Sequence, residues 1–177
     1  WAFAVNTVIA NYDAYNGTYV HNYYLYQTED GLFQMLPWDL SESYIGALLA
    51  NDIGSPTNDP SYDDPYLGDA DPTRPLTNVL LNNPLYRDQF TAHIRTVINE
   101  LSIPDLTSEI NDLQVLGYNA AASDPNKLFN MAQYASNVTT DLAYIPWGGY
   151  GFGGILSTLN KRIPFLSSHP EISLTPP

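Results

Sequence analysis

Three polar side chains near the start of the sequence could form a centre for phosphoryl transfer: Asp13, Asn22 and Asp39. Asp13 follows a predicted helix, Asn22 opens a predicted strand, and Asp39 comes just after the hairpin that this strand begins. Carboxylate and amide oxygens at one end of a hairpin can orient an acceptor hydroxyl and hold divalent cations. Residue types alone still favour a simpler interpretation, in which Asp13 caps a turn and Asp39 caps a helix that starts at Leu40.

The elements that must position these side chains are a helix and a hairpin. Apolar residues recur at helical spacing in residues 1–12, so we expect a helix that ends near Tyr12. Asn16-Gly17 predicts a turn. Residues 20–27 and 32–36 predict two antiparallel strands joined by a turn at Glu29-Asp30-Gly31, and Pro37 ends the hairpin.

The second half of the sequence predicts helices. Asn83-Pro84 is typical of a helix start, and the apolar stripe after it runs to about residue 101. Ser102 begins a capping pattern for a helix that we expect to end before Gly117. A third helix is expected from Asp124-Pro125, carrying Leu128, Phe129, Ala132 and Ala135. The glycine-rich stretch 146–154 predicts a turn before a last helix at about 155–167.

The composition excludes several kinds of protein. The 177 residues include 19 acidic and 6 basic side chains, for a net charge of −13, which argues against binding nucleic acid or an anionic membrane surface. The absence of cysteine excludes disulfides and thiolate chemistry. No apolar run is long enough to span a membrane. The three histidines, at positions 21, 93 and 169, have no metal-ligand spacing, and we expect structural roles for them.

Residues 51–75 form a long acidic loop with six Asp and five Pro. A loop of this length in a compact domain is usually functional or mobile. Oxygen ligands for Ca²⁺ are available from Asp59, Asp63, Asp64, Asp69 and Asp71, although their spacing does not fit an EF-hand. We favour a solvated polar loop over a calcium site.

Residues 11–46 resemble the CotH kinase family, the spore coat protein H-like secreted proteins with an atypical protein-kinase-like fold. The similar segments are Asn11-Tyr12-Asp13, then Asn22 to Tyr26, then Pro37-Trp38-Asp39-Leu40, and finally Gly46. Downstream, Arg74-Pro75-Leu76 before a helix pair and Lys161-Arg162 in the last helix also fit the family. The resemblance thus covers most of the chain, and its specific part is about 35 residues.

The resemblance implies roles for the three candidate residues. Asp13 is the catalytic aspartate beside the acceptor hydroxyl, and Asp39 is the metal-binding aspartate. Asn22 is a metal ligand or a brace for Asp13. Where the family has a second acid after Asp39, this chain has Ser41 followed by Glu42, so metal binding would rely on Glu42 or an Asp of the acidic loop.

The expected fold is therefore α+β and mainly α: a kinase-like C-terminal lobe, with a β-hairpin at the active centre and a helical remainder. We expect one domain over residues 1–177, made of a catalytic core at 1–50, the acidic loop at 51–75 and a helical part at 76–177. The N-terminal lobe of a kinase is absent from these residues, so we expect it elsewhere in the same chain or in a companion chain.

The resemblance also implies what the protein works with. Its cofactors would be ATP with Mg²⁺ or Mn²⁺, and its location would be extracellular or at the cell surface. It would phosphorylate Ser or Thr of a secreted, coat or surface protein. The alternative is a non-catalytic surface or assembly module on the same scaffold, which Ser41 and the missing lobe favour.

Overall fold

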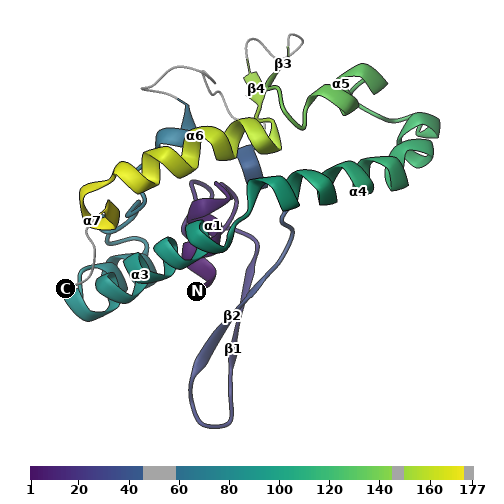
Figure 1. Cartoon of the computed structure of the whole chain (residues 1–177). Coiled ribbons are helices and arrows are strands. Elements are labelled where there is room, and N and C mark those ends of the chain that lie inside the picture. Colours follow the sequence, from purple (N-terminus) through teal and green to yellow (C-terminus); the bar gives the residue numbers. More distant parts are fainter. Residues whose placement is uncertain (46–58, 145–149, 174–177) are drawn as a thin grey trace.

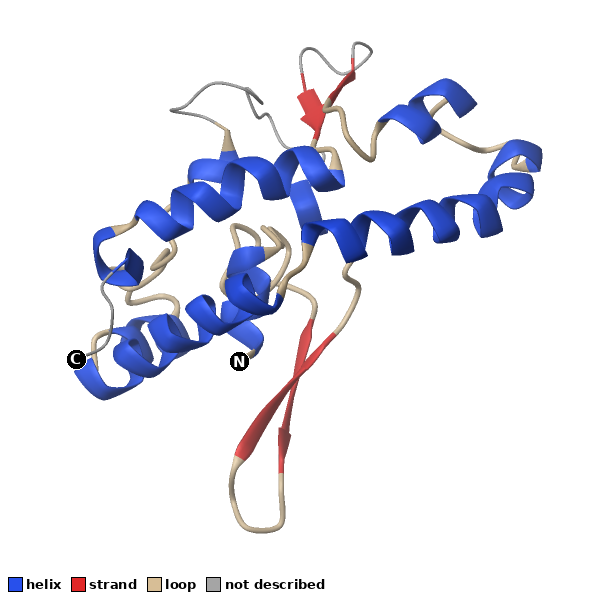
Figure 2. Ribbon diagram, in the orientation of Figure 1, coloured by secondary structure: helices blue, strands red, loops and turns tan. Residues whose placement is uncertain are grey.

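The computed structural model describes residues 1–45, 59–144 and 150–173. It is mainly helical, with two small antiparallel hairpins, which confirms the expected α+β composition (Figures 1 and 2). In chain order, the elements are α1 (Ala2–Val8), β1 (Tyr23–Gln27), β2 (Phe33–Pro37), η1 (Ser43–Ile45), η2 (Pro60–Tyr62), α2 (Pro75–Leu81), α3 (Pro84–Glu100), α4 (Ile103–Ser123), α5 (Met131–Ser136), β3 (Leu142–Tyr144), β4 (Tyr150–Phe152), α6 (Ile155–Ser168) and α7 (Pro170–Ser173).

The main core lies where α1 packs against α3 and α6. Its fully buried members include Ala4 and Val8 of α1, Ile94 of α3 and Leu166 of α6. Phe90, Leu81, Tyr66 and Ile172 complete this cluster. The short helix α1 is therefore anchored on both sides, and its C-terminal end leads directly into the segment that carries Asp13.

The predicted hairpin is confirmed, and it projects away from the helices (Figure 1). Strands β1 and β2 pair in the register Tyr23 to Pro37 and Gln27 to Phe33. Gly31 adopts φ 85° in the connecting turn, a conformation that favours glycine. Most side chains of both strands are exposed, so the hairpin is held at its base.

Two predicted helix starts are also confirmed. The Asn83 side chain accepts from the amide of Leu85 over 3.0 Å at the start of α3. The Ser102 side chain accepts from the amide of Asp105 at the start of α4. Side-chain oxygens at these positions satisfy amides that have no partner within the helix.

The predicted end of the first helix was wrong, because α1 stops at Val8 rather than near Tyr12. The amide of Asn11 donates to the carbonyl of Asn6 over 2.9 Å, and Ala10 between them has φ 49°. The helix thus ends with one residue, Ala10, in the left-handed conformation, a position that is usually occupied by glycine. Since alanine occupies the position, the sequence gives no stop signal there.

Three further predictions were wrong in the second half. Gly117 lies inside α4, which continues to Ser123 through Ala120-Ala121-Ala122, and alanine is the strongest helix former. Asp124 ends that helix rather than starting the next one. The following helix, α5, begins at Met131 behind an Asn130–Gln133 capping box. In the third case, the glycine-rich stretch 146–154 is not only a turn, because Tyr150–Phe152 within it form β4, which pairs with β3; residues 146–149 lie outside the described part.

The last predicted helix is confirmed as α6, and the segment from Arg74 leads into the helix pair α2 and α3 as expected. Of the acidic loop, residues 51–58 lie outside the described residues, as does Gly46. The described part of that loop contains η2 and a series of turns. None of the helices in the described ranges has both the length and the hydropathy needed to cross a bilayer.

Candidate functional site

The structure brings Asp13 and Asn22 into direct contact. The Asn22 side-chain amide donates to Oδ2 of Asp13 over 2.7 Å. On the other carboxylate oxygen, Nδ1 of His21 lies 3.0 Å from Oδ1. The backbone adds a third link, because the amide of His21 donates to the carbonyl of Asp13. Both oxygens of Asp13 are therefore oriented by the two residues that precede β1.

Asp39 lies at the other side of the hairpin base. The amide of Trp38 donates to the carbonyl of Asn22 over 3.0 Å, which places the residue before Asp39 beside Asn22. The Asp39 carboxylate is exposed and accepts from the amide of Ser41 over 3.1 Å. Hydrogen bonds from the Ser41 side chain and backbone lower the pKa of Asp39. Asp39 thus remains an anion with a free face toward solvent.

Glu42 connects the two aspartates electrostatically. Burial raises the pKa of Glu42, and the charges of Asp13 and of Asp39 raise it further. Both aspartates therefore lie within electrostatic range of the residue that follows Ser41. A carboxyl group whose pKa is raised by two like charges lies in an excess of negative charge, which a cation would relieve.

A second set of contacts fixes these segments against each other. The amide of Tyr44 donates to the carbonyl of Ile9 over 2.7 Å, and Ile45 packs in a buried cluster with Ala10 and Tyr12. Thr158 of α6 donates to the carbonyl of Tyr44. The segment before Asp13 and the segment after Asp39 are therefore bonded to each other, and the second of them is also bonded to α6.

Left-handed backbone is concentrated in this region. In the described residues, six non-glycine residues have positive φ, and all lie between positions 10 and 45: Ala10, Val20, Asn22, Asp39, Tyr44 and Ile45. Asn and Asp adopt this conformation more easily than other residues, whereas for β-branched side chains it is strained. Asn22 (φ 52°) and Asp39 (φ 43°) are two of the six. Strain of this kind persists where surrounding contacts enforce it, and it is typical of functional sites.

Behind this site, Arg162 of α6 joins three backbone segments. Its guanidinium, 4 % exposed, donates to the carbonyls of Thr7, Ser61 and Asp63. Thr7 lies in the last turn of α1, where carbonyl groups favour a positive charge. Desolvation lowers the pKa of Arg162. The residue is thus a buried cross-link between α1, α6 and the 59–63 segment.

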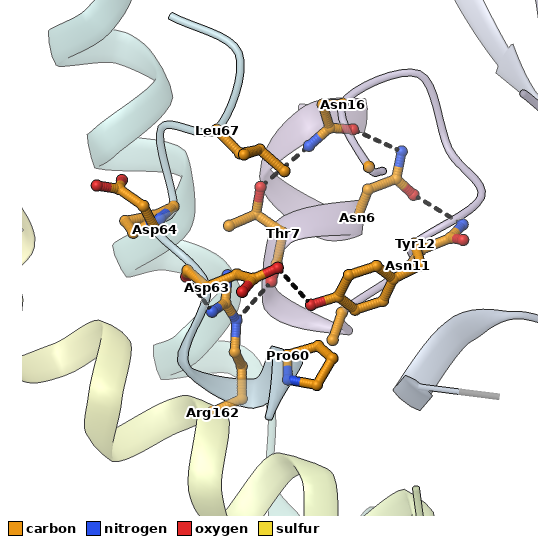
Figure 3. Close-up of a pocket in the computed structure, with 13 residues that line it drawn as sticks. Asn6, Thr7, Asn11, Tyr12, Asn16, Pro60, Asp63, Asp64, Leu67 and Arg162 are labelled. Atoms are coloured by element: carbon orange, nitrogen blue, oxygen red, sulfur yellow. Dashed lines mark hydrogen bonds between the residues drawn. The ribbon is translucent and has the colours of Figure 1, made fainter. Parts of the chain in front are cut away.

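Figure 3 shows a small cavity beside this cross-link. Tyr12 donates to Oδ2 of Asp63 over 2.7 Å, and burial, with the Asp63 carboxylate, raises the pKa of Tyr12. Asn16 donates to Oγ1 of Thr7 and accepts from Asn6. The cavity holds about 30 Å³, room for one or two water molecules. We interpret it as internal packing that supports the Asp13 segment.

A larger, mostly apolar pocket lies on the other side, at the base of the hairpin. It measures about 280 Å³ and includes Asn22 in its wall. Its apolar lining comes from α1 and both strands: Trp1, Val5, Ile9, Tyr23, Met35, Pro37 and Leu40. No basic residue lines it. The pocket can therefore receive a flat apolar group next to Asn22, but it offers nothing to neutralise phosphate.

All six basic side chains are already engaged within the protein. Arg74 donates to the carbonyls of Gly17 and Thr18, and so it braces the turn after Asp13. The others bind carboxylates or carbonyl oxygens: Arg87 with Glu171 and Asp69, Arg95 with Glu171 and Ile172, Lys127 with Ala122 and Asp124, Lys161 with Asp59 and Asp141, and Arg162 as above.

The carboxylates proposed for calcium are directed to different partners. Asp59 is fully buried and pairs with Lys161, so a uniformly solvated loop was also the wrong expectation. Asp69 and Asp71 pair with arginines, whereas Asp63 and Asp64 accept from Tyr12 and from the amide of Tyr66. In residues 1–45, 59–144 and 150–173, no three acidic or histidine side chains gather closely enough to hold a metal ion.

Comparison with known families adds one decisive match. The model of the family described as CotH kinase protein matches residues 2–145. The chain belongs to the CotH kinase family. The matched range contains Asp13, Asn22 and Asp39, the hairpin between them and helices α2 to α5. No curated protein and no solved structure matches the chain.

Several supporting residues of this family member were missed from the sequence. His21 was expected to have a structural role, which its contact with Asp13 does not contradict, but the contact itself was not predicted. Arg74 and Arg162 were noted only in segments that fit the family, and their contacts with backbone carbonyls were not predicted. The composition did contain a signal for these contacts. With only six Lys and Arg side chains among nineteen carboxylates, each basic side chain is expected to have a specific partner within the protein. Trp38 and Tyr24, on the two sides of the hairpin base, contact each other edge to face at 5.7 Å.

Proposed function

We propose that this protein is an atypical protein kinase that transfers the γ-phosphate of ATP to Ser or Thr hydroxyls of secreted, coat or surface proteins. Membership of the CotH kinase family supports the reaction class. The observation that carries the assignment of the site is the contact of Asn22 with Asp13, together with Glu42 lying within range of Asp13 and Asp39. The resemblance to secreted spore coat proteins supports an extracellular or cell-surface location.

In this proposal, Asp13 is the group that faces the acceptor. The acceptor hydroxyl oxygen forms a bond to the γ-phosphorus while the bond from that phosphorus to the bridging oxygen of ADP breaks. Asp13 accepts the hydroxyl proton. Asn22 and His21 hold the carboxylate in one orientation, since each contacts a different oxygen of Asp13. Orientation of this kind lowers the barrier without any covalent intermediate.

The residues on the hairpin base fit a hard divalent cation. Asp39 presents an exposed carboxylate, Asn22 an amide oxygen, and Glu42 a carboxyl group whose pKa is raised by burial and, after that, by the charges of Asp13 and Asp39. We propose that Asp39 and Asn22, with Glu42 in place of the acid missing at Ser41, hold Mg²⁺ or Mn²⁺. When bound, such an ion would neutralise charge on the phosphates of ATP. Further positive charge would come from an N-terminal lobe in the same or a companion chain.

The test is phosphate transfer from radiolabelled ATP to a protein substrate by the full-length protein. Asp13→Asn and Asp39→Asn are each expected to lower the rate by about 10²-fold or more, because each removes a charge at the reacting centre. Asp88→Asn, an exposed position on α3, is the matched control and should retain full activity. Melting temperatures of all three variants should stay within a few degrees of the parent. Full activity in Asp39→Asn would refute the assignment.

A non-catalytic assembly module is the second candidate. It is favoured by the internal use of all six cations and by the lack of a three-residue acidic cluster in the described residues. It predicts that ATP with Mg²⁺ does not raise the melting temperature of the full-length protein. A clear upward shift would argue against it, even if no substrate had yet been phosphorylated.

A further inference from the structure

Helix α4 carries an unusual amount of exposed apolar surface. Leu113, Val115, Leu116 and Tyr118 are between 50 and 81 % exposed, and Ile110 is the only buried residue of this 21-residue helix. In Figure 1, α4 extends away from the core formed by α1, α3 and α6. At helical spacing the exposed apolar side chains fall on two faces, Leu113 with Leu116 and Val115 with Tyr118. Exposed apolar side chains of this kind are typical of interaction surfaces.

One face of α4 combines two of these apolar residues with acids. Asp105, Glu109, Asp112, Leu113 and Leu116 follow one another at intervals of four, three, one and three residues, which keeps them on one side of a helix. All five side chains are exposed. We call this set the acid–apolar stripe. Its acids lie toward the start of α4 and its leucines lie near the middle.

A groove runs alongside the stripe, between α4 and α5. It measures about 370 Å³, and its lining is Asn111, Gln114, Val115, Tyr118, Asn119, Tyr134 and Ala135. Two reciprocal hydrogen bonds hold its walls: Gln114 donates to the carbonyl of Tyr134 over 2.8 Å, and the Tyr134 hydroxyl donates to the carbonyl of Gln114 over 3.0 Å. Gly117 faces this contact, and a Cβ there would lie 3.1 Å from the Tyr134 hydroxyl, which is a tight approach. The two hydrogen bonds fix α5 on another face of α4, so the acid–apolar stripe itself is left uncovered.

The charge around this surface has a single sign. Residues 102–144 contain five acids and one base, Lys127. The Lys127 ammonium already donates to the carbonyls of Ala122 and Asp124 at the end of α4. A complementary partner must bring its own cations. A second copy of this chain cannot do so, because each of its six basic side chains is engaged within its own fold.

We propose that the acid–apolar stripe binds a basic amphipathic helix of another protein. The apolar side chains of that helix would cover Leu113 and Leu116. Its Lys or Arg residues would lie against Asp105, Glu109 and Asp112. This inference does not depend on phosphotransfer, and in Figure 1 helix α4 and the hairpin extend from the core in different directions.

The experiment titrates the full-length protein with a labelled synthetic helix of about 18 residues, with leucine on one face and lysine on the other. Fluorescence anisotropy is read at low and at physiological salt. Binding should weaken as salt rises, because the charged contacts are exposed. A scrambled peptide of the same composition should bind at least about tenfold more weakly, since it cannot form one apolar face.

Variants locate the site. Leu113→Ser with Leu116→Ser should weaken binding about tenfold or more, and Asp112→Asn should flatten the salt dependence. Leu32→Ser at the hairpin tip, where the side chain is 65 % exposed, and Asp88→Asn on α3 are matched controls that should leave binding unchanged. Equal affinity in the stripe variants, or for the scrambled peptide, would overturn the proposal. Self-association of the protein would also overturn the proposal if the stripe variants abolished that self-association.

Discussion

The side-chain amide of Asn22 donates to Oδ2 of Asp13 over 2.7 Å, although nine residues separate the two in sequence. The contact joins the turn after α1 to the first residue before β1. Asn22 reaches it from a left-handed backbone conformation, with φ 52°. The hairpin is thereby attached at its base to the carboxylate that we propose as catalytic.

Replacing Asn22 tests this attachment. Asn22→Gly removes the amide while keeping a residue that adopts positive φ readily, so the backbone is spared. We expect the phosphotransfer rate to fall by about 10- to 100-fold, since Asp13 loses one of its two orienting contacts, with the melting temperature changed by only a few degrees. Asn22→Ala should lose the same activity and additional stability, because alanine is strained at this φ. Equal activity of Asn22→Gly and the parent would contradict the brace.

His21 provides the second orienting contact, 3.0 Å from Oδ1 of Asp13. His21→Gln keeps a donor of similar reach, whereas His21→Ala removes it. We expect kcat to fall in His21→Ala and to recover in part in His21→Gln, with KM for ATP nearly unchanged in both. His169→Ala serves as the control. Identical kinetics of the two His21 variants would show that the contact does not orient Asp13.

Glu42 yields a prediction about pH. Its pKa is raised above the ordinary 4.5 by burial and by Asp13 and Asp39, so the folded protein binds this proton more tightly than the unfolded chain does. The resulting stabilisation is complete below the unfolded pKa and is lost as pH rises through the folded pKa. At pH 7, Glu42→Gln should therefore raise the melting temperature by about 1–2 °C, and at pH 4 it should change little.

The same variant tests metal binding. Mg²⁺ should raise the melting temperature of the parent more than that of Glu42→Gln, because the variant lacks one of the carboxylates that a cation would relieve. Glu29→Gln in the hairpin turn is a matched, exposed control. A lower melting temperature of Glu42→Gln at pH 7 without metal would contradict the electrostatic argument.

Arg162 is expected to matter for stability rather than for chemistry. Arg162→Met leaves the carbonyls of Thr7, Ser61 and Asp63 without their buried donor, at a cost of about 3–5 kcal/mol in the free energy of unfolding. Urea unfolding measures this, and Lys127→Met on the surface should cost about 1 kcal/mol or less. If Arg162→Met does not fold, Arg162→Lys should show an intermediate loss. An unchanged free energy of unfolding in Arg162→Met would refute the cross-link.

The sequence predicted those parts of the fold where a residue has an unambiguous local effect. Asn83 and Ser102 cap helices through their own side chains, and Gly31 turns the hairpin. Other boundaries depend on distant contacts. Ala10 takes a left-handed conformation while Ile45 packs on it, and Gly117 stays helical with Tyr134 packed against it. Such boundaries cannot be predicted from neighbouring residues.

The candidate site shows the same division. Asp13, Asn22 and Asp39 could be selected because a family motif and the hairpin place them at known points of the chain. The contributions of Arg74 and Arg162 could not be predicted, because these side chains donate to backbone carbonyls more than fifty residues away in the sequence. A carbonyl carries no side-chain signature. Its partner becomes visible only when the chain is folded.

The internal use of every Lys and Arg has a consequence for kinetics. A molecule approaching from solution meets a field set by carboxylates, because the positive side chains are already paired within the protein. A polyanion such as free ATP is slowed by this field, and its magnesium complex is slowed less. Raising the ionic strength shortens the range of the repulsion, so nucleotide encounter should become faster in salt while capture of a basic helix becomes slower.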